Sequence, residues 1–299
     1  MQNLEEADGE SASEDDCWTP LQQAARAGDL PTLRTLIASG ADVNAPPQGY
    51  YGRTALQAAC LASHAEVVSA LLEAGADVDA APGNNDARNA LQIASGRPDV
   101  TIVETLLARG ADVNAPAARY YGATALQSAS AAGLTDVVEL LLARGADVDA
   151  APATTAGRTA LQAAAAHGEV EIAALLMDHG ADVNAPACRH KGLTALQAAS
   201  LRGDEGLVQR LLEAGAAVNA EGSRFKGGRA LHAAAEGGHV RVCEMLLDAG
   251  AGIEAGSGWG GQTALQGVVA RGHDAVVRVL RGRGATGTEG GGTFLFDRV

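Results

Sequence analysis

The sequence predicts an all-α fold, a solenoid of stacked helix-turn-helix units with projecting finger loops. Two observations support this prediction. A motif of the type Ala-Leu-Gln returns every 35 residues, apart from one step of 34, and a period in this range is typical of repeat arrays. Aromatic residues make up only 3% of a chain that is 47% hydrophobic. The core is therefore built from Ala, Leu and Val, which suits closely packed helices better than sheets.

The motif occurs in eight units. Its leucine falls at Leu21, Leu56, Leu91, Leu126, Leu161, Leu196, Leu231 and Leu265. A Gly-Ala pair follows the same spacing, from Gly40 to Gly284. We assign residues 17–285 to a repeat domain of eight repeats with a period of about 35. Residues 1–16 contain seven acids and no base, which predicts an acidic disordered tail. Residues 286–299 form a Gly-rich C-terminal tail.

The second repeat shows how each unit is built. Thr54 and Gln57 have the spacing of a capping box, which predicts that the first helix begins here. Leu56 starts the buried face of that helix. The helix ends near Ser63, where most of the other repeats have glycine. A second helix follows and ends at Gly75, as a left-handed C-cap requires. The rest of the repeat is a loop containing proline.

These residues carry a family resemblance. The segment Thr19–Gln22 (Thr-Pro-Leu-Gln), with Gly28 and the distal segment 40–44 (Gly-Ala-Asp-Val-Asn), resembles the ankyrin repeat, roughly over residues 17–285. The resemblance implies a helix pair and a hairpin-like finger in each repeat. Seven repeats have Gln where the family usually has His, which only His232 keeps. The period is longer than the common one by about two residues, in the loop. This style resembles long arrays found in fungal multidomain proteins.

Composition restricts the partners and the compartment. A net charge of −14 argues against nucleic acid and anionic membranes as partners. No apolar run approaches the length of a membrane span, and the acidic start lacks the features of a secretory signal. The four cysteines show no Cys-x-x-Cys spacing, which fits free thiols in a reducing compartment. We therefore expect an intracellular protein, cytoplasmic or nuclear.

The finger loops hold the candidate binding residues. Six of the nine aromatic residues lie there, and the fingers carry eight cations against two acids, a net charge of +6 on an acidic chain. Tyr, Trp and Arg are typical anchors of protein interfaces. The candidate protein-binding residues are Tyr50, Tyr51, Arg53, Arg88, Arg119, Tyr120, Tyr121, Arg158, Arg189, Lys191, Arg224, Phe225, Lys226 and Trp259. A structural alternative stays open for each of them: the tyrosines can cover the next loop, and the arginines can be solvated or can pair with nearby acids.

Other polar clusters have simpler interpretations. Three histidines occupy the inter-helix position, where we expect capping and packing: His64, His239 and His273. The eighth repeat is rich in arginine, which we interpret as a solvated end cap, with a docking surface as the alternative. These arginines are Arg271, Arg278, Arg281 and Arg283. Cys188 and His190 lie close in sequence, but a metal would need two more ligands, and none recurs nearby.

The pattern as a whole predicts a binding protein. We expect a monomeric scaffold or adaptor that binds a partner protein through its finger loops and inner helices, the partner contributing an acidic or phosphorylated segment. The alternative is the ligand-recognition segment of a larger multidomain signalling or defence protein. No Ser-His-Asp order, Gly-rich phosphate loop or carboxylate pair suggests catalysis. We therefore expect no enzymatic activity and no cofactor or metal.

Overall fold

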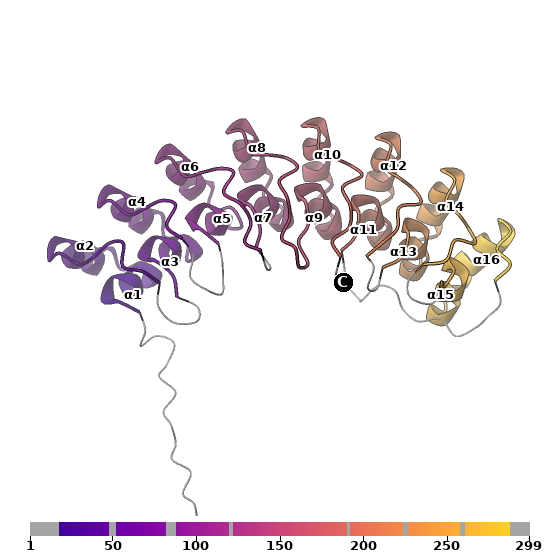
Figure 1. The fold of residues 1–299 in the computed structure, drawn as a ribbon, viewed down its shortest axis with the longest axis horizontal. Helices are drawn as coiled ribbons and strands as arrows, with labels where there is room; N and C mark the ends of the chain where they lie inside the picture. The colour runs from indigo at the N-terminus through magenta and orange to yellow at the C-terminus, as the bar shows by residue number, and fades with distance from the viewer. Residues whose placement is uncertain are drawn as a thin grey trace, which may run out of the picture. The chain divides into compact units, whose positions relative to one another are not determined.

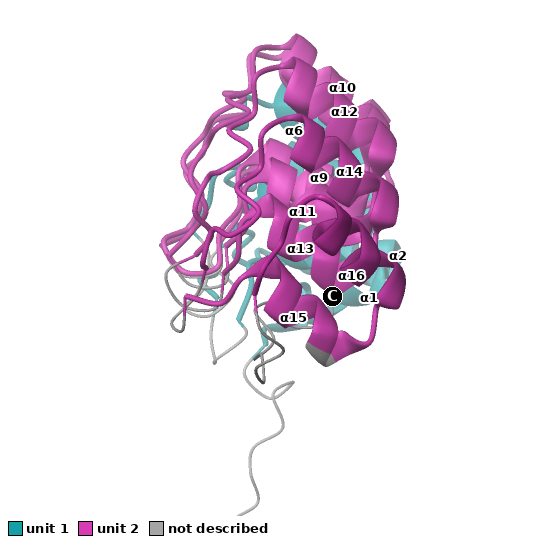
Figure 2. Cartoon of the chain, turned by 90° about the vertical axis from the view of Figure 1, so that its right-hand side faces the viewer, with its two compact units in different colours: residues 1–94, 101–111 teal, residues 95–100, 112–299 magenta. Residues whose placement is uncertain are grey.

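The computed structural model describes residues 18–47, 52–81, 88–119, 122–189, 192–223, 227–257 and 261–287. Within these ranges the regular structure is helical, apart from isolated bridges such as that between Ser257 and Gln262. The all-α class predicted from the sequence is confirmed (Figure 1). The chain divides into two compact units, coloured separately in Figure 2. Unit 1 comprises residues 1–94 and 101–111, and unit 2 comprises residues 95–100 and 112–299.

Unit 1 is made of short helices in two layers. The helices that fall wholly or mainly in it are α1 (Pro20–Ala27), α2 (Leu30–Ala38), α3 (Ala55–Leu61), α4 (Ala65–Glu73), α5 (Ala90–Ala94) and α6 (Val100–Ala108). The odd-numbered helices pack on one another in an inner layer, α1 on α3 and α3 on α5, and α2 packs on α4 in an outer layer. Each helix pair is thus stacked on the next, as the repeat pattern predicts.

Unit 2 continues the same arrangement. Its helices are α7 (Ala125–Ala132), α8 (Thr135–Ala143), α9 (Ala160–His167), α10 (Val170–Asp178), α11 (Ala195–Arg202), α12 (Glu205–Glu213), α13 (Ala230–Gly237), α14 (Val240–Asp248), α15 (Ala264–Arg271) and α16 (Asp274–Gly282). The odd-numbered helices form the inner layer and the even-numbered helices the outer layer. A loop connects each outer helix to the next inner helix and forms the finger (Figure 1).

Helix starts and stops follow the predicted chemistry. The Thr54 amide donates to Gln57 Oε1 at 3.1 Å, and the Gln57 amide donates to Thr54 Oγ1 at 3.2 Å, so the capping box is confirmed. α4 is followed by Gly75 in the left-handed conformation, with φ of 88°. Ser63 adopts φ of 58° at a place where the sister repeats have glycine. The repeat therefore imposes a left-handed turn even without glycine.

The core lies between the two layers and is built from leucine and alanine. Leu141 on α8 and Leu161 on α9 are 0% and 1% exposed. The inner helices meet through small side chains, among them Ala129, Ala164 and Ala199, all 0% exposed. Small residues let the inner helices approach closely, which explains how a chain with so few aromatics buries a continuous core.

The predicted tails fall mostly outside the described residues, which begin at 18 and end at 287. The first residues of the C-terminal segment do belong to the described part. Thr286 donates from its amide and, at 3.1 Å, from its hydroxyl to the same Glu254 carboxylate oxygen. The start of this segment is therefore hydrogen-bonded to the loop that precedes the eighth repeat.

Candidate protein-binding surface

Four fingers of unit 2 are narrow loops because a glycine closes the base of each: Gly122, Gly157, Gly192 and Gly227. A Cβ built on Gly157 would lie only 2.2 Å from the carbonyl oxygen of Ala153, four residues earlier. A Cβ built on Gly122 would likewise lie 2.3 Å from the backbone nitrogen of Ala118. Any side chain larger than hydrogen would force the two arms apart. These glycines were not among the residues predicted from the sequence, although from the second repeat on glycine recurs four residues before the motif leucine, except at Ala87 of the third repeat.

Neighbouring fingers of unit 2 are joined by hydrogen bonds. Thr154 donates to the Arg119 carbonyl from its amide at 3.0 Å and from its hydroxyl at 2.8 Å. The Cys188 thiol donates to the Thr154 carbonyl at 3.4 Å, and the Ser223 hydroxyl donates to the Arg189 carbonyl at 2.7 Å. We call these five residues the finger row. These bonds involve backbone carbonyls, one backbone amide and small side chains, so they hold the backbone of the row in place.

The structure separates the candidate arginines into two classes. Arg119 and Arg189, in the finger row, are exposed. Arg53, Arg88 and Arg158 are half-buried, each two residues before the first residue of an inner helix. The first class is therefore more accessible to a partner than the second. A charge count along the chain carries no information on burial, so the sequence alone places all five arginines in one basic edge.

The remaining candidates lie outside the described residues, so their placement stays a prediction. They are Tyr50, Tyr51, Tyr120, Tyr121, Lys191, Arg224, Phe225, Lys226 and Trp259.

The Gln of the repeat motif positions the fingers on the inner helices. Besides closing the capping box, Gln127 Nε2 donates to the Ala150 carbonyl at 2.8 Å. Gln162 Nε2 does the same to Ala185, at 2.9 Å. Each glutamine thus uses both ends of its amide and joins one helix start to the loop that leads into the next repeat. This double role explains how Gln can replace the His that is usual at this position in the ankyrin repeat.

The seventh repeat departs from this arrangement. His232 is 1% exposed, and its Nε2 lies 2.9 Å from the Gln262 carbonyl oxygen. Burial lowers the pKa of His232 from 6.5 to about 4, so the ring is neutral at physiological pH. Arg229 replaces the capping threonine and makes no cap hydrogen bond. Instead its guanidinium donates to the Asn219 carbonyl at 3.1 Å and lies 3.6 Å from Glu221.

The inter-helix histidines contact the preceding repeat, but the expected cap is not formed: His64 and His239 stand at the N-caps of α4 and α14 without a side-chain cap hydrogen bond. His64 Nε2 lies 3.2 Å from the Arg26 carbonyl oxygen of the preceding repeat. His239 makes the equivalent contact with Leu201 at 2.9 Å. Both rings therefore join one repeat to the next.

The inner-helix surface beside the fingers offers the second predicted contact region. Leu61 and Leu201 are half-buried there, and His167 is exposed with its Nδ1 2.9 Å from the Ala163 carbonyl oxygen. Ala198 of α11 is 1% exposed, so it belongs to the core and not to this surface.

Reactive groups are scarce in the part of the chain that the structure describes. No group of three His, Cys, Asp or Glu side chains is arranged to hold a metal there. Burial raises the pKa of the Cys60 and Cys243 thiols to about 12, which keeps both protonated and unreactive. No helix among these residues is both long and apolar enough to cross a membrane.

Stacked helix pairs, capped starts and hydrogen-bonded fingers define a helical repeat array. The chain belongs to the ankyrin repeat family: the family model for ankyrin repeats (3 copies) matches residues 3–82, 80–152, 149–222 and 207–289. Ankyrin repeats generally serve as protein-interaction modules, and the family is typically non-catalytic. A search of curated proteins finds no match to this chain.

Proposed function

We propose that the chain is a scaffold or adaptor that binds an acidic or phosphorylated segment of a partner protein along the finger row and the adjoining inner helices. One observation carries the proposal. Arg119 and Arg189 expose their side chains to solvent, whereas their backbone carbonyls accept hydrogen bonds from the neighbouring fingers. Because the backbone is already held, binding does not have to order the loop, and the planar fork of the guanidinium suits carboxylate and phosphate.

Charge supports the same choice of partner. The chain is acidic overall, so an exposed basic edge directs an anionic segment to one surface of the molecule. The candidate aromatics would add apolar contact area between the charges. The same surface would serve if the chain were the recognition segment of a larger signalling or defence protein. Free thiols fit the intracellular compartment that the proposal assumes.

An array of acidic, phosphorylated and neutral peptides tests the proposal. The parent chain should bind acidic and phosphorylated peptides in preference to neutral ones. Arg119→Ala with Arg189→Ala should weaken that binding by about tenfold or more, because each lost charge-assisted hydrogen bond is worth about 1.5 kcal/mol or more.

The matched control removes the same charge elsewhere. Arg109 and Arg144 are exposed residues that follow the outer helices α6 and α8. Arg109→Ala with Arg144→Ala should leave binding close to that of the parent. Equal binding by parent, finger variant and control would refute the finger row as the binding site, and absence of any preference for anionic peptides would refute the choice of partner.

A further inference from the structure

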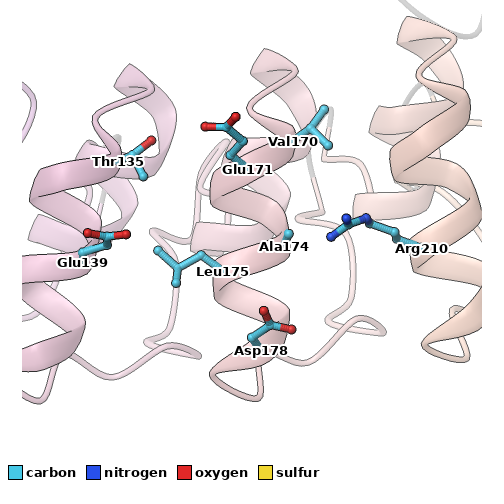
Figure 3. Close-up of a pocket in the computed structure, with 8 residues that line it drawn as sticks. All are labelled: Thr135, Glu139, Val170, Glu171, Ala174, Leu175, Asp178 and Arg210. Carbon is cyan, nitrogen blue, oxygen red and sulfur yellow. The ribbon is translucent and has the colours of Figure 1, made fainter.

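A groove lies on the outer layer of unit 2, whereas the surface proposed above uses the finger row and the inner helices. It has a volume of about 370 Å³ and is lined by residues of α8, α10 and α12 (Figure 3). Its floor is formed by α10, where Ala174 and Leu175 are half-buried. The groove is separate from the surface proposed above, and its chemistry is different.

The groove exists because α10 has a small residue where three other outer helices have a long one. Ala174 is the fifth residue of α10, and the fifth residue of α8, α12 and α14 is Glu139, Gln209 and Glu244 respectively. Each of these side chains is long enough to extend over the surface of its own helix. Alanine leaves that space empty, so the apolar floor beside Leu175 stays accessible. The groove thus arises from one local departure in a repeated surface.

The rim of the groove is acidic. Glu139 from α8 and Glu171 and Asp178 from α10 contribute three carboxylates, and α12 contributes one cation, Arg210. All four side chains are exposed. In Figure 3, Arg210 extends from the neighbouring helix toward α10, and the two carboxylates of α10 lie near opposite ends of the floor. Among the described residues none of these four side chains forms an ion pair, and the lining has a net negative charge.

We propose that this groove docks a basic segment of a partner protein. In this arrangement an apolar side chain of the partner covers Ala174 and Leu175, and flanking Lys or Arg side chains reach the carboxylates around them. Charge complementarity selects a basic partner, since the lining carries three acids against one base. An apolar anchor in a partly desolvated pocket, with charges at its rim, is the usual arrangement of a small interface hot spot.

The probe is a short fluorescent peptide with one leucine flanked by lysines, and its control has glutamate in place of every lysine. Fluorescence anisotropy with the full chain should show binding of the lysine peptide and none of the glutamate peptide. Ala174→Gln should reduce affinity by about tenfold because it refills the floor. This variant should fold, because glutamine already occupies the same place in α12 at Gln209. Circular dichroism checks the fold.

A position-matched pair separates the groove from general attraction to an acidic chain. Glu171 and Asp178 are the second and ninth residues of α10, and Glu66 and Glu73 hold the same places in α4. The change Glu171→Gln with Asp178→Asn should weaken binding by about tenfold, and Glu66→Gln with Glu73→Gln should leave it nearly unchanged. Equal losses in both double variants would overturn the proposal, as would unaltered binding by Ala174→Gln or no binding by the parent.

Discussion

Arg271 and Glu236 form an ion pair that joins the last two repeats, with 2.8 Å between Arg271 Nη2 and Glu236 Oε2. The Glu236 side chain is 1% exposed and that of Arg271 is 19% exposed. Glu236 belongs to α13 and Arg271 ends α15, so the pair crosses the interface between inner helices. The interpretation of the terminal arginines as a solvated end cap is therefore wrong for Arg271, whose charge is used inside the array.

Arg271→Ala should destabilise the eighth repeat by about 3 kcal/mol, because it leaves the Glu236 carboxylate buried without its cation. Urea denaturation gives the loss, and amide exchange of α15 and α16 shows where it falls. Arg283→Ala is the control. Arg283 pairs with Asp248 at 2.8 Å, but these side chains are 45% and 61% exposed, so we expect less than about 1 kcal/mol. Equal losses in the two variants would mean that burial of the first pair adds nothing.

The buried His232 should make stability depend on pH. Its pKa is lowered from 6.5 to about 4, mainly by burial and further by Arg229. The unfolded chain therefore takes up the proton at a higher pH than the folded chain. The stability that the neutral His232 contributes is fully present above pH 6.5 and is lost as the pH decreases toward about 4. Below that pH this contribution does not change further. The largest loss is roughly 3 kcal/mol for a shift of this size.

A variant isolates this effect from other titrating groups. Arg229→Thr with His232→Gln restores the threonine and glutamine that cap α7, α9 and α11. Denaturation of parent and variant across the acid range should give curves that are parallel above about pH 7 and diverge below it. Parallel curves throughout would show that His232 does not carry the pH dependence.

Much of the fold could be predicted because the same capping, core and turn residues recur at equivalent positions in successive repeats. The capping box of Thr54 and Gln57, the buried Leu56 and the left-handed Gly75 all follow from local chemistry. Even the turn at Ser63 could be anticipated, since the sister repeats have glycine there. Each repeat contacts mainly its neighbours, so a local pattern determines most of the structure.

The candidate surfaces were harder to predict. The candidates Tyr50, Tyr120, Phe225 and Trp259 stand six residues before a motif leucine, whereas Arg119, Thr154 and Arg189 of the finger row stand seven residues before one. Contact between fingers depends on how neighbouring loops are aligned in space, which the leucine spacing does not specify. The outer groove was missed because its cause is an absence: Ala174 is small where α8, α12 and α14 have long polar residues.

Replacement of Asp149, which hydrogen-bonds to the loop of the next repeat, should stabilise unit 2. Asn114 accepts a hydrogen bond from the Asp147 amide at 2.8 Å and donates one to the Gly145 carbonyl at 3.0 Å. Asp149 holds the same place one repeat later and accepts from the Asp182 amide at 2.9 Å, but an ionised carboxylate has no proton to donate. Asp149→Asn should add the second bond and stabilise by about 0.5 kcal/mol, measured by thermal denaturation.

The reverse change is its control. Asn184 donates to the Gly215 carbonyl at 3.1 Å, and Asn184→Asp should lose this bond and destabilise by a similar amount. If both substitutions shift the midpoint in the same direction, net charge and not the missing hydrogen bond determines the result.

Gly157→Ala should disrupt a finger while leaving the helices in place. Its Cβ would lie 2.2 Å from the Ala153 carbonyl oxygen, a backbone atom that cannot move aside without opening the finger. We expect a loss of about 1 to 3 kcal/mol, as in other overpacked sites, together with weaker binding of anionic peptides because the Thr154 bonds to Arg119 are displaced.

Gly206→Ala is the matched control: the nearest atom to its Cβ is 3.7 Å away, and alanine favours the first turn of α12. That variant should be as stable as the parent or more so and should bind peptide equally well. Intact binding by Gly157→Ala would show that the shape of this finger is not needed for recognition.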